Sequence, residues 1–410
     1  MEKVTYKAYR FRLYPTKEQE IFFAKHFGCS RFVYNYFLNE RIKYYTEHKN
    51  DAKKGLTYID TQRMLVELKN QPETIWLKEV NSQTLQVSLQ HLDTSFNNFF
   101  KGISKFPKFK KKSHEQKFSV PQSFKISGKE LFIPKLKSGI KFVKHREIVG
   151  TPKSLTICKR PSGKYFVSIL CAIKQEVVEP KPVEFSGAVG IDLGIKHFAV
   201  LSNGEKIESP KYLRKSEILL KRRQRKLSRK VKGSKNFHKQ RVCVARLYEH
   251  ISNQRDDFLH KLSHRLVCEN QALFFENLNV QGMLRNHRLA KSIFDASWSK
   301  FQTYCKYKAE NFGKVYLQIG RFEASSRTCS KCGHINNELT LDVREWKCSN
   351  CNTHHDRDVN AAKNILNLGY ISYSKLPTEY REVMPVEKRK TFHRKVEAVS
   401  AKQEAATSLG

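Results

Sequence analysis

The sequence predicts a multidomain protein of the α+β class, with one part in which strands and helices alternate as in α/β proteins. The length of 410 residues is more than a single ordinary hydrophobic core requires. Hydrophobic residues make up 39% of the chain and aromatic residues 11%, which is enough to build such cores. The patterning changes along the chain, from helical in 16–102 to short alternating segments in 105–176 and then to alternating strands and helices in 187–368.

The first part of the chain is predicted to be a β domain that carries a helical insertion. Residues 3–14 alternate between polar and apolar side chains, which is typical of a strand. Thr16 can cap a first helix, and further helices are expected from Ser30 and Ser82. Short segments between residues 117 and 174 alternate between turn signals, so they predict an antiparallel sheet or a small barrel that the first strand can join.

Aromatic side chains are dense in the helical insertion. Most of them are expected to pack in its core, whereas one or two could stack on nucleobases. The residues concerned are Phe32, Tyr34, Tyr36, Phe37, Phe96, Phe99 and Phe100.

The second part of the chain is predicted to combine a hairpin sheet with later strands and helices. Residues 187–208 indicate two or three strands with a turn at 202–204. A strongly basic helical hairpin follows, interrupted at Gly233 and Ser234. The remaining expected elements are a strand at 272–280 containing a carboxylate, a helix at 290–313, a strand at 314–320, a helix that ends at Gly369, and a disordered tail at 371–410.

The charge of the chain predicts an anionic partner. There are 77 Lys and Arg against 39 Asp and Glu, which gives a net charge of +38. Such a charge repels itself unless an anion shares it, and nucleic acid is the usual partner, although a basic surface or a ribosomal-type role is the alternative. Residues 211–241 hold 14 Lys and Arg and a single acid, Glu217, so phosphate contact is favoured there over a merely solvated face.

A cytoplasmic location is expected. The amino-terminal residues lack the apolar segment of a secretory signal, and the sequence has no apolar run of about 18 residues, so no membrane partner is expected. Ten cysteines in that compartment do not predict a disulfide framework. Six are scattered singly and are expected to be small core residues: Cys29, Cys158, Cys171, Cys243, Cys268 and Cys305.

The other four cysteines predict a structural zinc site. Cys329 and Cys332 form one C-x2-C pair, and Cys348 and Cys351 form a second pair after 15 residues. Two such pairs converge as a tetrahedral S₄ site, which suits Zn²⁺ and leaves no open position for catalysis. A redox dithiol is the weaker alternative. The neighbouring histidines, His334, His354 and His355, are not needed as ligands.

Several acids occur where a structural role does not explain them well. Asp192 lies inside an apolar strand and Glu276 at the end of another, so each is costly to bury without a partner or a metal ion. Asp356 and Asp358 stand at the start of a late helix, where Asp356 is the natural N-cap. Asp192, Glu276 and an acid at the start of the late helix together predict a site for two Mg²⁺ ions, suited to phosphodiester hydrolysis, and the order of elements fits an RNase H-like sheet.

Four segments carry a resemblance to a known family. They are "GIDLGIKHFAV", "FFENLNV", "SSRTCSKCG" and "VREWKCSNCNTHHDRDVNAAKNI", and together with the amino-terminal "YKAYRFRLYPTKEQEIFFAKHFGCSRFVYNYFL" they resemble TnpB (OrfB) of bacterial insertion sequences, relatives of type V CRISPR effectors. The resemblance implies a transposon-encoded, Mg²⁺-dependent RNA-guided DNA endonuclease. Its partners would be a guide RNA, with one copy of the chain per RNA, and double-stranded target DNA recognised beside a short motif. It would act in the bacterial cytoplasm, at the nucleoid.

The resemblance also implies a division into domains. A wedge-like β-barrel domain is expected at 1–15 and 103–182, with a helical recognition lobe at 16–102. A RuvC-type (RNase H-like) nuclease domain is expected at 183–322 and 354–370. Residues 323–353 would be a zinc-ribbon insertion that binds target nucleic acid.

Particular residues take roles by the same resemblance. Asp192, Glu276 and Asp358 would be the metal ligands of the nuclease, with Asp356 as the second choice for the last of them. Arg344 would be a finger arginine that approaches the scissile phosphate, unless it is only a surface arginine. Asn352 stands where a glycine often follows the second cysteine pair, and asparagine also accepts left-handed backbone geometry.

Other functions remain open from the sequence alone. A nuclease-silent, RNA-guided DNA-binding regulator would share the fold, but the intact acids argue against it. A transposase that performs strand transfer would use the same metal chemistry. A basic zinc-ribbon protein that only binds RNA would leave Asp192 and Glu276 unexplained.

Overall fold

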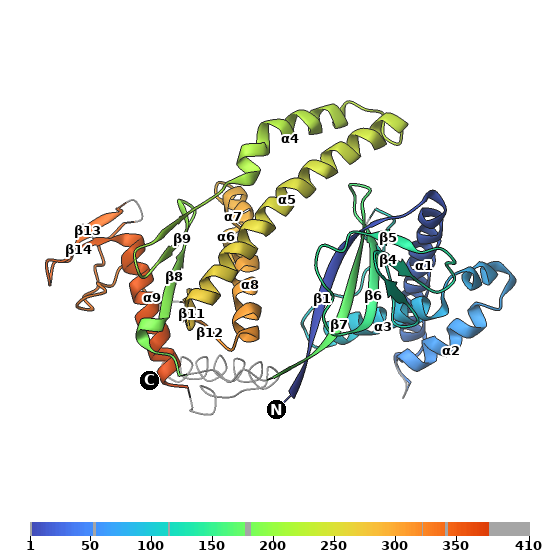
Figure 1. Ribbon diagram of the computed structural model, residues 1–410, viewed down its shortest axis with the longest axis horizontal. Coiled ribbons are helices and arrows are strands. Elements are labelled where there is room, and N and C mark those ends of the chain that lie inside the picture. Colours follow the sequence, from blue (N-terminus) through green and yellow to red (C-terminus); the bar gives the residue numbers. More distant parts are fainter. Residues whose placement is uncertain are drawn as a thin grey trace. The chain divides into compact units, whose positions relative to one another are not determined.

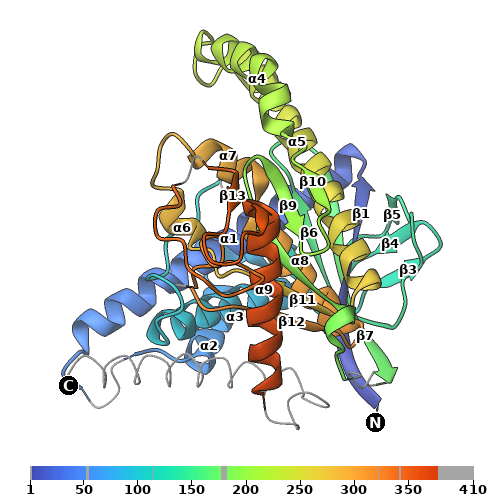
Figure 2. The ribbon, with the colours of Figure 1, turned by 90° about the vertical axis from the view of Figure 1, so that its left-hand side faces the viewer.

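The computed structural model divides into two compact units, each described here by itself (Figures 1 and 2). Unit 1 comprises Met1–Glu176 with Val231–Arg246, and unit 2 comprises Val177–Lys230 with Leu247–Gly410. The structure describes residues 2–51, 55–113, 115–176, 182–321, 323–340 and 343–376. Most of the predicted tail at 371–410 therefore lies outside the described residues.

Unit 1 contains a seven-stranded antiparallel sheet with the first strand at its centre. Strand β1 (Glu2–Tyr14) pairs with β7 (Tyr165–Glu176) on one side and with β5 (Ile140–Phe142) on the other, which confirms that the amino terminus joins this sheet. The other strands are β2 (Gln116–Val120), β3 (Lys125–Ser127), β4 (Glu130–Phe132) and β6 (Thr151–Lys159). Their order is β2-β6-β7-β1-β5-β4-β3.

Of the two predicted alternatives, an antiparallel sheet or a small barrel, the described residues form the sheet, and its strand order is open. Strands β2 and β3 stand at its two ends and are not hydrogen-bonded to each other in the described part of the chain. A helix completes the core instead. Phe23 and Phe27 of that helix are almost fully buried against apolar side chains of the sheet, among them Phe118 and Leu131. Burial of these aromatic rings supplies apolar contact that closure of the barrel would otherwise provide.

The helix in question, α1 (Lys17–Glu47), is continuous where the sequence predicts two helices. Thr16 and Gln19 form the capping box at its start. Gly28 does not end the helix, because both halves are held by packing: the first half enters the sheet core, and the second half, through Val33 and Phe37, enters a separate helical core. Tertiary contacts of this size outweigh the roughly 1 kcal/mol that a glycine costs inside a helix.

The second core of unit 1 confirms the prediction that residues 16–102 are mainly helical. It is built by the later half of α1 together with α2 (Tyr58–Leu68), the 3₁₀ segment η1 (Pro72–Glu79) and α3 (Ser82–Phe100). Asn81 caps α3 by accepting from the backbone N–H of Gln83. The helical segments contribute leucines that are fully buried, including Leu77, Leu85 and Leu89.

Unit 2 is organised around a five-stranded sheet of order β10-β9-β8-β11-β12. Strands β8 (Ala188–Leu193), β9 (His197–Leu201) and β10 (Lys206–Glu208) form the predicted antiparallel hairpins. Strands β11 (Ala272–Phe275) and β12 (Val315–Gln318) run parallel to β8. The chain thus forms a strand, a hairpin, a helix, a strand and a helix in this order, which is the order that the sequence predicts for an RNase H-like sheet.

Helices cover both faces of this sheet. The basic hairpin is formed by α4 (Tyr212–Ser228) and α5 (Lys235–Glu269). One face of the sheet packs against the later part of α5 and against α8 (Trp298–Asn311). The other face is covered by α9 (Arg357–Ser374), drawn in red in Figures 1 and 2. Two short helices, α6 (Val280–Met283) and α7 (Ala290–Ala296), precede α8.

The helix predicted at 290–313 is broken in two at Ser297. This residue has a φ of 56°, in the left-handed region, and its hydroxyl donates to the carbonyl of Phe294. The break changes the direction of the chain so that Trp298, which is 1% exposed, begins α8 inside the core. Burial of the large indole stabilises the fold by more than the strained residue costs.

The scattered cysteines differ in their exposure. Four of the scattered cysteines are buried as predicted, but Cys243 and Cys268 are exposed on α5, because they lie on the polar side of that amphipathic helix. No helix within the described residues is both long and apolar enough to cross a membrane.

Candidate metal centres

The register of two parallel strands brings the first two acids together. Ile191 of β8 is paired with Phe275 of β11, so the next residue on each strand, Asp192 and Glu276, is level with the other at the same end of the sheet. Parallel neighbours lie about 4.8 Å apart along the hydrogen-bonding direction. Because Ile191 and Phe275 both face the core under α5 and α8, both acids point to the opposite face, which α9 covers.

Both acids are held in an environment that disfavours their charge. Burial raises the pKa of Glu276 from 4.5 to about 7, although a hydrogen bond from the backbone N–H of Leu193 acts in the other direction. The pKa of Asp192 is raised well above its usual range by burial first, and then by the charges of Glu276 and Asp358. Carboxyl groups whose pKa is raised in this way, and which have no salt bridge to another of the described residues, favour a cation between them.

The third acid reaches this face because a glycine allows the helix to approach the sheet. A Cβ at Gly190 would lie 2.1 Å from the carbonyl oxygen of Ala362, so α9 rests directly on the backbone of β8. The strand advances about 6.6 Å from Gly190 to Asp192, and the helix about 6 Å from Ala362 back to Asp358. The two elements therefore carry Asp192 and Asp358 to the same end of the contact.

The opposite end of the contact fixes the direction of α9. The hydroxyl of Tyr373 accepts from the backbone N–H of Val183, just before β8. The predicted end of the helix at Gly369 is wrong, because α9 continues to Ser374. A Cβ at Gly369 would lie 2.3 Å from the ring of Phe274, so this glycine serves close helix–sheet packing and not helix termination.

Asp356 has a different role from Asp358. Its Oδ1 accepts from the backbone N–H groups of Asp358 and Val359, at 3.1 and 3.0 Å, which makes it the N-cap of α9. Its Oδ2 accepts from Lys206 Nζ at 2.6 Å. Burial alone would raise the pKa of Asp356, but these partners lower it. Because both of its carboxylate oxygens already accept hydrogen bonds, Asp356 is a poorer candidate for a metal ligand than Asp358.

Arg344 lies beside the acids. Its Nη1 donates to Asp358 Oδ1 at 3.3 Å, and about half of its side chain is exposed. The positive charges of Arg357 and Arg344 oppose the rise in the pKa of Asp192. Arg344 is thus a half-exposed cation at the edge of the carboxylate cluster.

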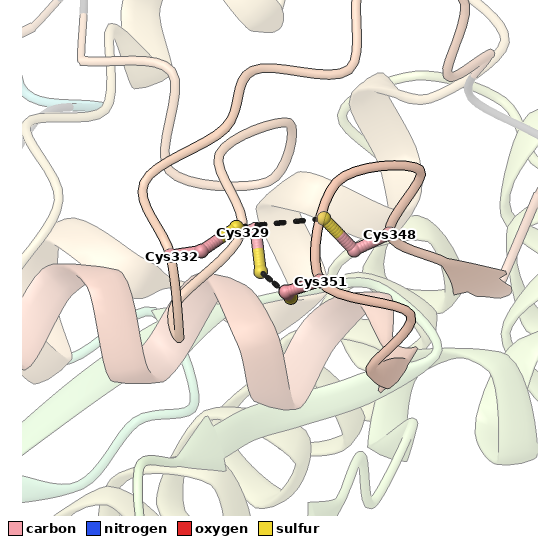
Figure 3. A group of neighbouring side chains, drawn as sticks. All are labelled: Cys329, Cys332, Cys348 and Cys351. Carbon is pink, nitrogen blue, oxygen red and sulfur yellow. Dashed lines mark hydrogen bonds between the residues drawn. The ribbon is translucent and has the colours of Figure 1, made fainter.

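The four cysteines that are predicted to bind zinc form a compact cluster (Figure 3). Cys329 and Cys351 bring their Sγ atoms to 3.6 Å, and so do Cys332 and Cys348. These distances exclude disulfides, whose sulfurs lie about 2.0 Å apart. Four thiolates bound to Zn²⁺ at about 2.3 Å would have sulfurs about 3.8 Å apart, so the donor set fits a tetrahedral cation.

Each cysteine pair closes its loop with the same backbone device. The N–H of Gly333 donates to the carbonyl of Cys329, and the N–H of Asn352 donates to that of Cys348. Both Gly333 and Asn352 have left-handed backbones, with φ of 77° and 57°. The substitution of asparagine for glycine in the second loop is therefore accommodated as the sequence predicts.

The surroundings of the cysteines shift the pKa values of two thiols in opposite directions. Hydrogen bonds with Thr353 lower the pKa of the Cys351 thiol to about 6, whereas burial raises the pKa of Cys329 to about 11. His355 Nε2 lies 3.0 Å from Cys329 Sγ, so this histidine contacts a ligand and is not one of the four converging donors. Its ring also packs on Trp346 across the hairpin of β13 (Glu345–Lys347) and β14 (His354–Asp356).

Two buried asparagines that the sequence reasoning missed connect the two clusters. Asn360 donates to the carbonyl of Thr328 and accepts from the N–H of Ser330. One turn later, Asn364 donates to the carbonyls of Ser325 and Thr328. The loop that leads into Cys329 is thereby bound to the same helix that carries Asp358. Their spacing of four residues on an otherwise apolar helix face is the signal that could have found them.

The two clusters differ in compactness. Among the described residues, the cysteine cluster is the group of metal-binding side chains whose ligand atoms all lie within 4.8 Å of one another. Asp192, Glu276 and Asp358 do not satisfy that distance, although their charges act on one another. The ligand atoms of the acids are therefore more widely spaced than those of the cysteines.

Residues 168–287 match a family described as "Probable transposase", the OrfB family of IS605 elements, and residues 298–365 match the "Cas12f1-like, TNB domain". Residues 1–50 match a family described as "Helix-turn-helix domain". In this chain, the described part of that range forms β1 and α1 instead of two helices joined by a turn.

A relative from Streptomyces pristinaespiralis, named as a candidate RNA-guided DNA endonuclease, is 39% identical over 368 residues, which cover 88% of this chain and 89% of the relative. This chain belongs to the TnpB family, which is related to Cas12f. Another TnpB relative, InsQ of Escherichia coli K12, is 33% identical over 89% of this chain and 92% of its own length. The TnpB-like protein L770 of Acanthamoeba polyphaga mimivirus is 22% identical over 88% and 72% of the two chains.

A solved structure is also similar to this TnpB chain. It is a Cas12f1–sgRNA–target DNA complex determined by cryo-EM, with a TM-score of 0.47 and 15% identity, covering 89% of this chain and 99% of the other.

Proposed function

We propose that this TnpB chain is a transposon-encoded, RNA-guided DNA endonuclease that cleaves target DNA by metal-dependent phosphodiester hydrolysis. The observation that carries the proposal is the convergence of Asp192, Glu276 and Asp358 at one end of the sheet, in an environment that raises the pKa of two of them. The net charge of +38 suits nucleic-acid partners, and the relatives with 39% and 33% identity are named for RNA-guided DNA cleavage.

The proposed reaction needs cations that the three acids would hold. Two Mg²⁺ ions suit oxygen ligands, and when bound they supply activation of the attacking water and stabilisation of the leaving 3′ oxygen. The residues themselves contribute the negative charge and its placement: Asp192 and Glu276 are fixed by strand register, and Asp358 by the seating of α9.

Side chains around the acids would handle the substrate. Arg344, which contacts Asp358, would exchange that contact for the phosphate that undergoes cleavage, as the finger arginine of the proposal. The hairpin of α4 and α5, with its dense Lys and Arg, would contact nucleic-acid phosphates. A short motif beside the target would be recognised by the protein, and pairing with the guide would supply the rest of the specificity.

The cysteine cluster would hold one structural Zn²⁺. Four thiolates leave no coordination position free, so its contribution would be to the fold of the module and not to the reaction. We assign residues 323–353 to this zinc-ribbon module, 183–322 and 354–370 to the RuvC-like nuclease domain, 1–15 and 103–182 to the wedge-like domain, and 16–102 to the recognition lobe.

The experiment is a cleavage assay with the RNA that co-purifies with the protein. We expect cutting of DNA that matches the guide, in the presence of Mg²⁺, and loss of cutting with Asp192→Ala while RNA binding persists. If the Ala variant still cuts, the site assignment is wrong. If the parent protein cuts or joins DNA without RNA, a strand-transfer enzyme is supported, and guide-dependent binding with no cutting supports a silent regulator.

A further inference from the structure

Unit 1 displays a cluster of phenylalanines at its surface, where α3 ends and the basic loop at 101–112 begins. We call it the aromatic platform; its members are Phe96, Phe99, Phe100, Phe106 and Phe109. Phe100 is 77% exposed, Phe109 48% and Phe106 44%. Soluble proteins seldom leave adjoining aromatic side chains in water, and such patches mark interaction sites.

The rings of Phe96, Phe99, Phe100 and Phe106 contact one another. Phe106 meets Phe96 and Phe99 edge to face, with centroids 5.6 and 5.3 Å apart. Phe100 lies near Phe99 at 5.3 Å and is almost parallel to Phe96. Phe96 is itself half-buried at the edge of the helical core, so the cluster extends from an anchored ring to the most exposed one.

The loop that completes the platform is fixed at both ends. At its start, Gly102 adopts a left-handed backbone and the N–H groups of Ile103 and Ser104 donate to the carbonyl of Asn98. At its other end, the side chain of Asn35 on α1 both accepts from the N–H of Lys110 and donates to its carbonyl. The exposed rings are therefore presented by an ordered segment, which lowers the entropic cost of binding.

The charge around the rings selects the kind of partner. Residues 96–112 contain six lysines and no acid. Lys101, Lys105 and Lys108 are exposed, and Lys110 Nζ lies 3.6 Å from the centre of the Tyr34 ring. Flat apolar faces ringed by cations complement the unpaired bases and phosphates of a single strand, whereas an apolar protein surface gains nothing from the lysines.

We propose that the aromatic platform binds unpaired nucleobases of a single-stranded nucleic acid, with Phe100 as the principal stacking residue. The site adds a binding surface to the proposed function and rests on it only in that nucleic acid is the partner. The lysines would contact the phosphates on either side of the stacked base, so the site takes any base and recognises single-strandedness. In a duplex the bases are stacked on one another and their faces are not available.

The test uses the full-length chain and 12-nucleotide RNA and DNA single strands that carry 2-aminopurine, in buffer without divalent cations. We expect the parent protein to quench the fluorophore and Phe100→Leu to bind about fivefold more weakly, with the quenching lost. Leucine keeps the side chain apolar, so only the stacking face is removed. Ile103→Ala is the matched control, because Ile103 is 61% exposed on the same loop but has no ring.

Each outcome decides for or against the platform. A preference for RNA or for DNA assigns the bound base to the guide or to an unpaired DNA strand, and either supports the proposal. Equal affinity of parent and Phe100→Leu overturns it, as does equal affinity for a blunt duplex. A loss with Ile103→Ala as large as with Phe100→Leu also overturns it in favour of apolar docking.

The platform and the proposed nuclease can fail separately. Guided cleavage by the parent protein together with unchanged quenching by Phe100→Leu would remove the platform and leave the nuclease. Phe100-dependent quenching in a protein that never cleaves DNA would support the platform and remove the nuclease. Lys105→Gln and Lys108→Gln should each reduce the salt dependence of binding by about one ion, without loss of the quenching.

Discussion

The four cysteines and the three acids of unit 2 are assembled by different means, although Asp358 follows Cys351 by only seven residues in the chain. The cysteines converge through two short loops, each closed by its own backbone hydrogen bond and left-handed residue. The acids converge through the register of β8 and β11 and the packing of α9. One cluster is therefore local, and the other depends on the whole sheet.

The two clusters are stabilised in different ways. The module of two cysteine loops has a small core, centred on Leu339 and Trp346, so we expect it to need a bound cation in order to fold. The sheet has a large core of its own, so it can hold three like charges together without a cation, at a cost in stability. Removal of a ligand should therefore damage the first cluster and relax the second.

The largest expected effect is on cleavage by Asp192→Asn. We predict a loss of about a thousandfold or more, because a metal ligand is lost, with zinc content unchanged. In the absence of divalent cations the variant should melt at a higher temperature than the parent, since a buried charge that faces Glu276 is removed. Guided cleavage and thermal melting measure the two effects; a variant that melts lower in this buffer would contradict the comparison.

Cys348→Ser should show the opposite behaviour in the other cluster. We predict that bound zinc falls from about one ion per chain to well below one, and that residues 323–356 become sensitive to protease while the rest of unit 2 resists. Metal analysis and limited proteolysis check this. Lys347→Ser, at the exposed residue next to Cys348, is the control and should retain the zinc; full zinc in Cys348→Ser would refute the assignment.

Gly190→Ala tests the packing that brings Asp358 to the strand. The added methyl group would meet the carbonyl of Ala362, so we predict destabilisation of about 3 kcal/mol and strongly reduced cleavage. Gly28→Ala is the control, since nothing lies within 4 Å of its Cβ, and it should stabilise the chain by about 0.5–1 kcal/mol. Equal stability of the two variants, measured by denaturant unfolding, would rule out close seating of α9 on β8.

Much of this organisation could be predicted from the sequence, because its signals are local. Cysteine spacing, strand alternation around Asp192 and the capping position of Asp356 each predict the feature that the structure contains. The misread helix ends have a common cause. Gly28 and Gly369 look like helix stops, but whether a glycine ends a helix or allows close packing depends on the element opposite it.

Other features were not accessible because they depend on tertiary contacts. Nothing in the local sequence distinguishes the open sheet of unit 1 from a barrel, since closure depends on whether Phe23 and Phe27 of α1 fill the space. The break at Ser297 likewise follows from where Trp298 must be buried.

The smallest expected effect is a dependence on pH. Because burial raises the pKa of Glu276 from 4.5 to about 7, the folded chain holds the proton more tightly than the unfolded chain. Stability without divalent cations should therefore fall as the pH rises from about 4.5 to about 7, and the affinity for Mg²⁺ should rise over the same interval. Melting and metal titration across this range measure both; in Glu276→Gln the contribution from this residue should disappear.

The most direct test of the carboxylate centre compares Asp358→Asn with Asp356→Asn in guided cleavage of DNA. The two residues are two positions apart, and asparagine preserves both the size of the side chain and its capacity to cap a helix. The account predicts that Asp358→Asn abolishes cleavage and retains RNA and zinc, whereas Asp356→Asn cleaves within a fewfold of the parent protein. Retained cleavage by Asp358→Asn, or its loss only in Asp356→Asn, would contradict the assignment of the metal ligands.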